Sequence, residues 1–229
     1  MGIILALIII ALWGFHLAYM LSYVAFSTGN PWMYLHIVIQ AYLYTGLFIT
    51  GHDAMHGGVA RSKQLNNVLG ASATFLFAGM SYWRLKKNHK MHHRFPAAKE
   101  DPDFYTGSQN FWVWWGTFMW RYLTLGQLII MAAAFNVFVH IFRMGEFKVL
   151  TYWALPAILG TLQLFYFGVY RPHRLPHQEN MMPHRARSQS KNHLWAMLSC
   201  YFFGYHFEHH ENPGIPWWKL YQSKQPNTE

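Results

Sequence analysis

The chain has 229 residues, of which 53% are hydrophobic, 19% aromatic and only 12% charged. Soluble domains carry roughly 25% charged residues, so this composition excludes an ordinary water-soluble domain and indicates a protein that lies in lipid. The chain is basic, but its excess of positive charge falls in a few loops, so no nucleic acid is expected as a partner. A single cysteine, Cys200, excludes an intrachain disulfide and a metal site built from several thiolates.

Four apolar stretches are long enough to cross a bilayer, which takes about 20 helical residues. The third stretch, residues 122–142, contains no proline. The fourth, residues 149–170, contains Pro156, which a spanning helix tolerates as a kink. Shorter apolar runs at 68–83 and 193–204, and an aromatic stretch at 111–120, predict re-entrant or interfacial helices. The expected fold is therefore an all-α integral membrane protein with one domain over residues 1–229. The four predicted spans are residues 2–27, 32–52, 122–142 and 149–170.

The positions of the charges predict the orientation of these helices. Most lysines and arginines fall between residues 61 and 99 and between 171 and 191, whereas the turns at 27–31 and 143–148 hold none and two. Loops rich in lysine and arginine remain in the cytoplasm. We therefore expect both termini, and a histidine-rich cap made of residues 52–110 and 171–220, at the cytoplasmic face of the inner membrane.

Three histidine clusters lie in or beside this cap. H-x-x-x-H begins at His52, and H-x-x-H-H begins at His89 and again at His206. On a helix, positions i, i+3 and i+4 share one face, so the rings of each cluster converge. Eight histidines exceed the four ligands of one tetrahedral zinc, and imidazole also suits iron, copper and nickel, so more than one ion is expected. The candidate ligands are His52, His56, His89, His92, His93, His206, His209 and His210.

Three further histidines, His16, His36 and His140, stand alone in apolar spans. The sequence offers no evident partner for them, and we expect structural or pathway roles rather than metal ligation. All three clusters, by contrast, are predicted at one membrane face, where separate helices bring them together.

The order and spacing of the clusters resemble those of the integral-membrane non-haem di-iron family of fatty-acid desaturases, alkane hydroxylases and carotenoid oxygenases. The resemblance covers about residues 30–222 and is greatest to β-carotene ketolases. Gly58 and Arg171 depart from the family pattern, at positions that bear on substrate range. The segments that carry the resemblance are H-D-A-M-H-G at 52–57, N-H-K-M-H-H-R-F-P at 88–96, D-P-D-F at 101–104, R-P-H-R at 171–174 and Y-H-F-E-H-H-E-N-P at 205–213.

The resemblance implies a ketolase with two non-haem irons that uses O2 and two electrons per turn. Two hydroxylations at carbon 4 of the β-ionone ring of β-carotene, followed by loss of water, would give echinenone and canthaxanthin. The implied partners are a carotenoid (β-carotene or zeaxanthin), membrane lipid and an acidic electron donor such as ferredoxin, which the basic surface would attract. Anionic headgroups explain the same basicity equally well.

Family sites commonly use a ninth histidine, and the Pro-His-Arg segment identifies it as His173. Its competitors are His177, His184 and His193. Rings that bind metal need hydrogen-bond acceptors for their other nitrogen, and helix capping or solvation is the alternative role for Asp103 and Glu211. The expected acceptors are Asp53, Glu208, Asp103 and Glu211.

Other functions remain open at this point. A hydroxylase acting on ring carbon 3 or a lipid desaturase would share the metal chemistry, and its products would differ. A membrane metal transporter would instead need ligands along a path across the bilayer, and would hold labile zinc without consuming oxygen.

Overall fold

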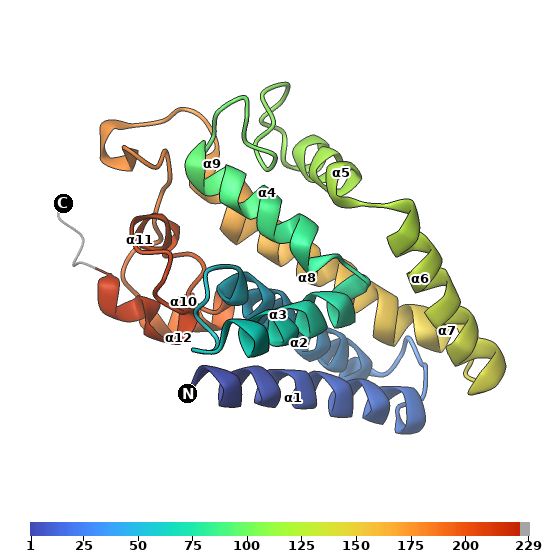
Figure 1. The fold of residues 1–229 in the computed structure, drawn as a ribbon. Helices are drawn as coiled ribbons and strands as arrows, with labels where there is room; N and C mark the ends of the chain where they lie inside the picture. Colours follow the sequence, from blue (N-terminus) through green and yellow to red (C-terminus); the bar gives the residue numbers. More distant parts are fainter. Residues whose placement is uncertain (225–229) are drawn as a thin grey trace.

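The computed structural model describes residues 1–224, which form helices, turns and loops without a β-strand in that range (Figure 1). Short π-helical turns cover Val137–Ile141, Leu150–Ala154 and Tyr166–Tyr170, and 3-10 turns cover Glu179–Met181 and Tyr221–Ser223. The α-helices are α1 (Gly2–Tyr23), α2 (Pro31–Met55), α3 (Lys63–Ala78), α4 (Tyr82–Arg94), α5 (Phe111–Tyr122), α6 (Leu125–Asn136), α7 (Glu146–Val149), α8 (Leu155–Phe165), α9 (Arg171–His173), α10 (His193–Cys200), α11 (His206–Glu211) and α12 (Trp217–Leu220).

Three helical segments are long and apolar enough to cross a membrane: Gly2–Tyr23, Pro31–Met55 and Glu146–His173. A fourth candidate is the pair α5 and Leu125–Ile141, which bends by 90° at its break. The predicted span at 122–142 was therefore wrong at its start, because Leu123 is extended and the Thr124 side chain caps a new helix by accepting from the Gln127 amide. The first span ends at Tyr23 rather than 27, since Val24 is extended.

Prolines shape the last long helical segment. The π-helical turn Leu150–Ala154 comes just before Pro156, and the turn Tyr166–Tyr170 comes just before Pro172. Proline has no amide hydrogen and its ring clashes with the carbonyl four residues earlier, so a wider turn relieves the contact. The second wide turn delivers His173 at the C-terminal end of the segment.

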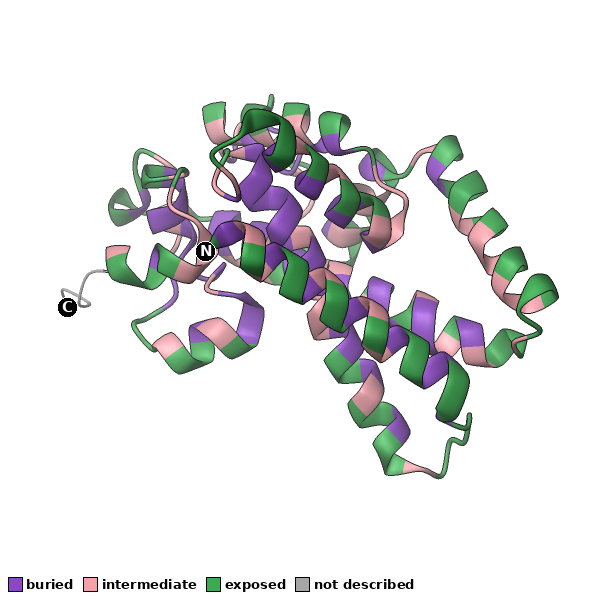
Figure 2. Ribbon diagram, turned by 60° about the horizontal axis from the view of Figure 1, so that its bottom comes forward, coloured by how far each residue is buried: buried purple, intermediate pink, exposed green. Residues whose placement is uncertain are grey.

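The outer helices present apolar side chains to their surroundings. Ile4, Phe15, Leu125 and Ile129 are more than half exposed, while α2 is buried along much of its length. Figure 2 shows this contrast between exposed outer helices and a buried centre. Such exposed hydrophobic faces are what a bilayer covers. The finding that three or four helices qualify as spans agrees with an all-α membrane fold.

Polar groups also lie between α1 and α2. His16 Nδ1 donates to Gln40 Oε1 at 2.6 Å, and His36 Nδ1 then donates to His16 Nε2 at 3.1 Å. The expectation that His16 and His36 have no partner was therefore wrong, because α1 and α2 pack side by side and bring the two rings together with Gln40. These bonds satisfy polar groups that would otherwise lie unpaired in lipid.

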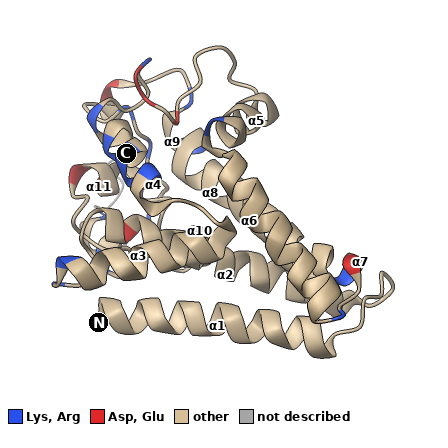
Figure 3. Ribbon diagram, turned by 45° about the vertical axis from the view of Figure 1, so that its right-hand side comes forward, with Lys and Arg blue, Asp and Glu red and all other residues tan. Residues whose placement is uncertain are grey.

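Charged residues gather toward one end of the molecule. Figure 3 shows most lysine and arginine near α4, α11 and the start of α3, where the N-terminus also lies. The turn that joins α1 to α2 and the turn that joins the π-helical residues Val137–Ile141 to α7 lie at the opposite end (Figure 1). This asymmetry agrees with the charge distribution expected from the sequence.

Candidate metal centre

Four helices supply the histidines of the site: α2 with its C-cap, α4, α9 (which ends at His173) and α11. His52 lies on the last turn of α2 and His56 is its C-cap, while α4 carries the second cluster and α11 the third. Ser81 starts α4 by accepting from the Arg84 amide, and Asn66 fixes the segment after α2 by donating to the Ala54 carbonyl. The first cluster thus lies at the braced C-terminal end of the long helix α2, and the second lies on α4, whose start is capped.

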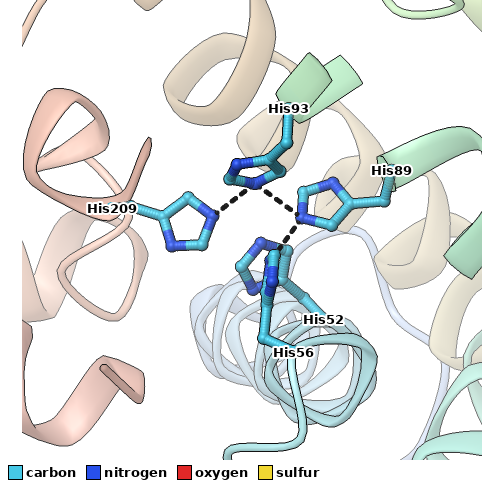
Figure 4. A group of neighbouring side chains, drawn as sticks. All are labelled: His52, His56, His89, His93 and His209. Carbon is cyan, nitrogen blue, oxygen red and sulfur yellow. Dashed lines mark hydrogen bonds between the residues drawn. The ribbon is translucent and has the colours of Figure 1, made fainter. Parts of the chain in front are cut away.

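Five rings converge on one point, which we call the five-ring group (Figure 4). Their ligand nitrogens all lie within 4.8 Å of one another. The Nε2 atom of His89 is 2.7 Å from that of His56 and 3.0 Å from that of His93, which is itself 3.0 Å from Nε2 of His209. The group consists of His52, His56, His89, His93 and His209.

Four other rings form a second group beside the first, which we call the four-ring group. It consists of His92, His173, His206 and His210, all of them buried. The Nε2 atoms of His206 and His173 are 3.0 Å apart, and Nε2 of His210 lies 3.1 Å from that of His206 and from that of His92. The two groups adjoin, because the rings of His93 and His210 stack with centroids 4.3 Å apart.

The two H-x-x-H-H clusters divide between the groups in opposite ways. On α4, His89 and His93 join the five-ring group and His92 joins the four-ring group. On α11, the outer pair His206 and His210 joins the four-ring group and His209 joins the five-ring group. Each helix therefore contributes to both groups, which ties the nine rings into one continuous cluster.

The spacing of the nitrogens fits metal ligation. A metal–nitrogen distance of about 2.1 Å with ligands at right angles gives nitrogen–nitrogen separations of about 3.0 Å, whereas tetrahedral angles give about 3.4 Å. The observed values of 2.7 to 3.1 Å match the right-angled case. In addition, Nε2 of His52 is buried without a hydrogen-bond partner among the described residues. Five imidazoles around one point also exceed the ligand number of a closed zinc site.

Acceptors on the far side of three rings orient them toward the groups. Nδ1 of His92 donates to Oδ2 of Asp101 at 2.9 Å, and Nδ1 of His52 donates to Oδ1 of Asp53 at 3.2 Å. Nδ1 of His173 donates to the Arg185 carbonyl at 3.0 Å. Each bond places the proton on Nδ1 and leaves the Nε2 lone pair free for a metal ion.

Asp53 also connects the site to the C-terminal part of the chain. Its Oδ2 accepts from the Trp217 amide at 2.8 Å, so the end of α2 is tied to the start of α12. Gly168 permits another close contact: a Cβ there would lie 2.2 Å from Phe203, whose ring packs 4.8 Å from His52 and 5.2 Å from His206.

The structure changes the assignment of the remaining acidic residues. Asp103 Oδ2 lies 3.8 Å from Nδ1 of His92, and it is Asp101 that makes the direct hydrogen bond. The sequence reasoning missed Asp101, although its place two residues before Asp103 in the D-P-D turn was a usable signal. Glu208 was expected to accept from a ring, but it accepts from Ser188 and from Lys224 at 2.9 Å. Glu208 lies two residues after His206 on α11, so its side chain points away from the helix face that carries the His206 ring.

The other candidates take different places. Glu211 is exposed at the end of α11. His177 donates from Nε2 to the His173 carbonyl at 2.9 Å, and His193 lies 3.1 Å from the Tyr205 hydroxyl. The His184 ring lies 5.7 Å from that of His210, outside both groups. Of the four candidates for a ninth ligand, His173, at the end of α9, is the one that the geometry adds to the clusters.

Burial keeps most of these rings neutral, which is the form that binds metal. Desolvation, followed by the charge of Lys86, lowers the pKa of His56 to about 4, and desolvation lowers the pKa of His93 to about 2. The pKa values of His89 and His209 are also held well below the ordinary value by burial. The exception is His92: burial opposes its protonation, but the Asp101 and Asp103 carboxylates together raise its pKa.

An apolar cavity reaches the rings from between α3, α5, α6 and α8. Phe48, Phe77, Phe118 and Leu164 line it, and its inner end touches four of the histidines. Those four are His52, His89, His92 and His206, which belong to both groups. The cavity therefore gives the candidate metal centre an apolar approach.

The fold and the site define a helical membrane protein with a candidate dinuclear histidine centre. The chain matches the fatty acid desaturase family over residues 29–144 and 124–225. It is 37% identical to zeaxanthin 4-ketolase of Chlamydomonas reinhardtii over 98% of this chain, and 36% identical to β-carotene 4-ketolase 3 of Haematococcus lacustris over 84%. It is 35% identical to the β-carotene ketolase of Paracoccus sp. (strain PC1), covering 80% of this chain and 76% of that protein.

The chain belongs to the fatty acid desaturase family and, within it, to the group that contains the carotenoid ketolases. It spans 53% of the length of the Chlamydomonas relative and 63% of the Haematococcus one.

Proposed function

We propose that this protein is a membrane-bound di-iron oxygenase that introduces a keto group at carbon 4 of the β-ionone ring of a carotenoid. The observation that carries the proposal is the pair of adjoining histidine groups at the inner end of an apolar cavity. The similarity to β-carotene and zeaxanthin ketolases supports the choice of substrate class.

The proposed reaction balances over two rounds. In the first, a ring C–H bond, O2, two electrons and two protons give a ring alcohol and water. In the second, the same reagents give a geminal diol and water, and the diol loses water to leave the ketone. Iron held by the five-ring and four-ring groups would supply O2 reduction and C–H oxidation, which no protein side chain supplies by acid–base chemistry.

The chain's own residues have separate tasks in this scheme. Neutral imidazoles would hold the ions without burying further anions beside lipid, which would be costly. Asp101 and Asp53 fix the orientation of His92 and His52 through their Nδ1 atoms. The aromatic and aliphatic side chains of the cavity wall would exclude water and hold the ring of the substrate against the site.

We infer that the electron donor is an acidic protein such as ferredoxin that docks on α4. Lys87, Lys90 and Arg94 are exposed on one face of this helix, while the opposite face supplies three ring ligands. A donor bound to the cationic face would sit one helix diameter, about 10 Å, from the centre. Complementary charge would guide its approach.

We also propose four spans, with the bent α5 and α6 pair as the third, and the histidine cap at the cytoplasmic face of the inner membrane. The positive charge at the cap end supports this orientation (Figure 3). Single cysteines at Lys90 and Arg143 test it in intact cells, where an impermeant thiol reagent should label position 143 and leave position 90 unlabelled. The native Cys200 is buried and should not interfere.

The central experiment measures iron and products together. The purified protein should hold two irons per chain and convert β-carotene to 4-keto products only with O2 and a reductant. Zeaxanthin supplied side by side tells whether hydroxylated rings are accepted. Products oxidised at carbon 3, or a new double bond in a lipid chain, would replace the ketolase proposal with a sister activity. Labile zinc without oxygen consumption would favour a metal transporter.

A further inference from the structure

The cavity that reaches the histidines is apolar along most of its wall, but a polar pair stands at its inner end. Tyr122, from the end of α5, and Asp103, from the loop after α4, both line the cavity and are 9% and 8% exposed. The Tyr122 hydroxyl donates to Oδ1 of Asp103. Oδ2 of Asp103 lies 3.8 Å from Nδ1 of His92, so the pair is adjacent to the four-ring group.

Other bonds hold this pair in position. The Trp114 indole donates to the Asp103 carbonyl at 2.8 Å, and the Asp103 amide donates to Oδ1 of Asp101 at 2.9 Å. Arg121 donates to the Phe104 carbonyl at 2.7 Å, which ties the same loop to α5. The orientation of the polar pair is therefore set by the protein before any ligand enters.

An unsubstituted carotene ring has no group that this pair can hydrogen-bond. The alcohol made in the first round of the proposed reaction has one, because its O–H is a donor and its oxygen an acceptor. The Tyr122 oxygen, having given its hydrogen to Asp103, retains lone pairs that can accept from an alcohol. In an apolar cavity such a bond gains strength, since water does not compete for it.

We propose that Tyr122, oriented by Asp103, is a specificity-determining residue that binds the ring alcohol and retains it for the second oxidation. This inference rests on the proposed ketolase function and deepens it. The phenol oxygen supplies the difference in binding between the alcohol and the unsubstituted ring. A protein without that contact would release the alcohol more often, as a hydroxylase does.

Tyr122→Phe removes the contact and keeps the ring. Supplied with β-carotene, the variant should release 4-hydroxy and 4-keto products in a ratio about three- to tenfold higher than the parent protein, which is the size of one net hydrogen bond. The KM for a 4-hydroxylated β-ring carotenoid should rise by the same factor, and that for β-carotene should stay within twofold. Tyr170→Phe is the matched control, since Tyr170 packs on Phe165 and Trp114 beside the cavity without lining it.

A purely structural role for Tyr122 would lower iron content and total product without changing the ratio. An unchanged ratio in Tyr122→Phe, or an equal change in Tyr170→Phe, would overturn the inference while leaving the ketolase proposal intact. A parent protein that makes no 4-oxygenated product would overturn both. If Tyr122→Phe does not fold, binding to the iron-loaded parent without reductant decides: the 4-hydroxylated carotenoid should bind about three- to tenfold more tightly than β-carotene, and equal or weaker binding overturns the inference.

Discussion

His93 and His210 stack with their ring centroids 4.3 Å apart, yet they belong to different ligand groups. His93 comes from α4 and directs Nε2 toward His89 and His209, whereas His210 comes from α11 and directs Nε2 toward His206 and His92. This stack is the boundary between the two proposed metal positions. Substitutions of neighbouring histidines on one helix should therefore affect different metal positions.

His209→Ala and His210→Ala test that division, because the two residues are adjacent in sequence and serve different groups. We expect each variant to lose ketone formation, and we expect each to leave membrane insertion intact. Iron analysis should show about one iron per chain in His210→Ala, since only three rings of the four-ring group remain. His184→Ala is the control, as its ring lies near His210 but outside both groups; retained ketone in His209→Ala would remove that residue from the ligand set.

Asp101→Asn should weaken iron binding by about 10- to 100-fold, the usual effect of removing the partner that orients a ligating histidine. The amide can still accept from Nδ1 of His92, but it no longer carries the negative charge that favours this bond. Glu208→Gln is the comparison, because Glu208 pairs with Lys224 and Ser188 instead of a ring. We expect the Gln variant to bind iron as the parent does, measured by competition with a chelator. Equal losses in both variants would contradict the separate roles.

Charge reversal on α4 should slow electron delivery. In Lys87→Glu combined with Lys90→Glu, turnover with an acidic donor protein should fall about tenfold at low ionic strength, and less so in high salt, where the Debye length shrinks. A small uncharged reductant should support the variant as well as the parent. Arg143→Glu is the matched control, since Arg143 lies in the turn before α7, at the opposite end of the molecule from α4. A loss that persists with the small reductant would mean damage to the site rather than to docking.

Because Gly168 has no side chain, the Phe203 ring can pack against His52 and His206. Gly168→Ala would place a methyl group about where Phe203 now lies, since a Cβ there would be 2.2 Å from its ring. Overpacking of this kind costs about 1–3 kcal/mol, and we expect a lower unfolding temperature and less ketone.

Adding Phe203→Leu to Gly168→Ala should restore part of both losses, because the smaller side chain leaves room for the methyl group. Gly116→Ala on α5, where a Cβ would have no neighbour within 4 Å, should have no such effect. Additive losses in the double variant would show that the two residues do not act through this contact.

The sequence alone determined the class of fold and the set of candidate ligands. Long apolar stretches predict membrane helices because a helix satisfies its own backbone hydrogen bonds in lipid. The i, i+4 spacing of His52 and His56 places both rings on one face. The family motifs added His173. The nine histidines chosen from the sequence are the same nine that the structure gathers into two groups, although their role as iron ligands is still a proposal.

Only the tertiary structure decided how those rings are divided. Helical spacing aligns His89, His92 and His93 on one face but does not tell which ring faces which partner, because that depends on how α4 and α11 pack against α2. The same applies to Asp101 and Glu208, whose partners lie on other segments, and to the break at Leu123 and Thr124, where the helices on either side meet at a 90° bend. The spacing of residues along a helix determines which side chains share a face, and the packing of distant segments determines which residues those side chains contact.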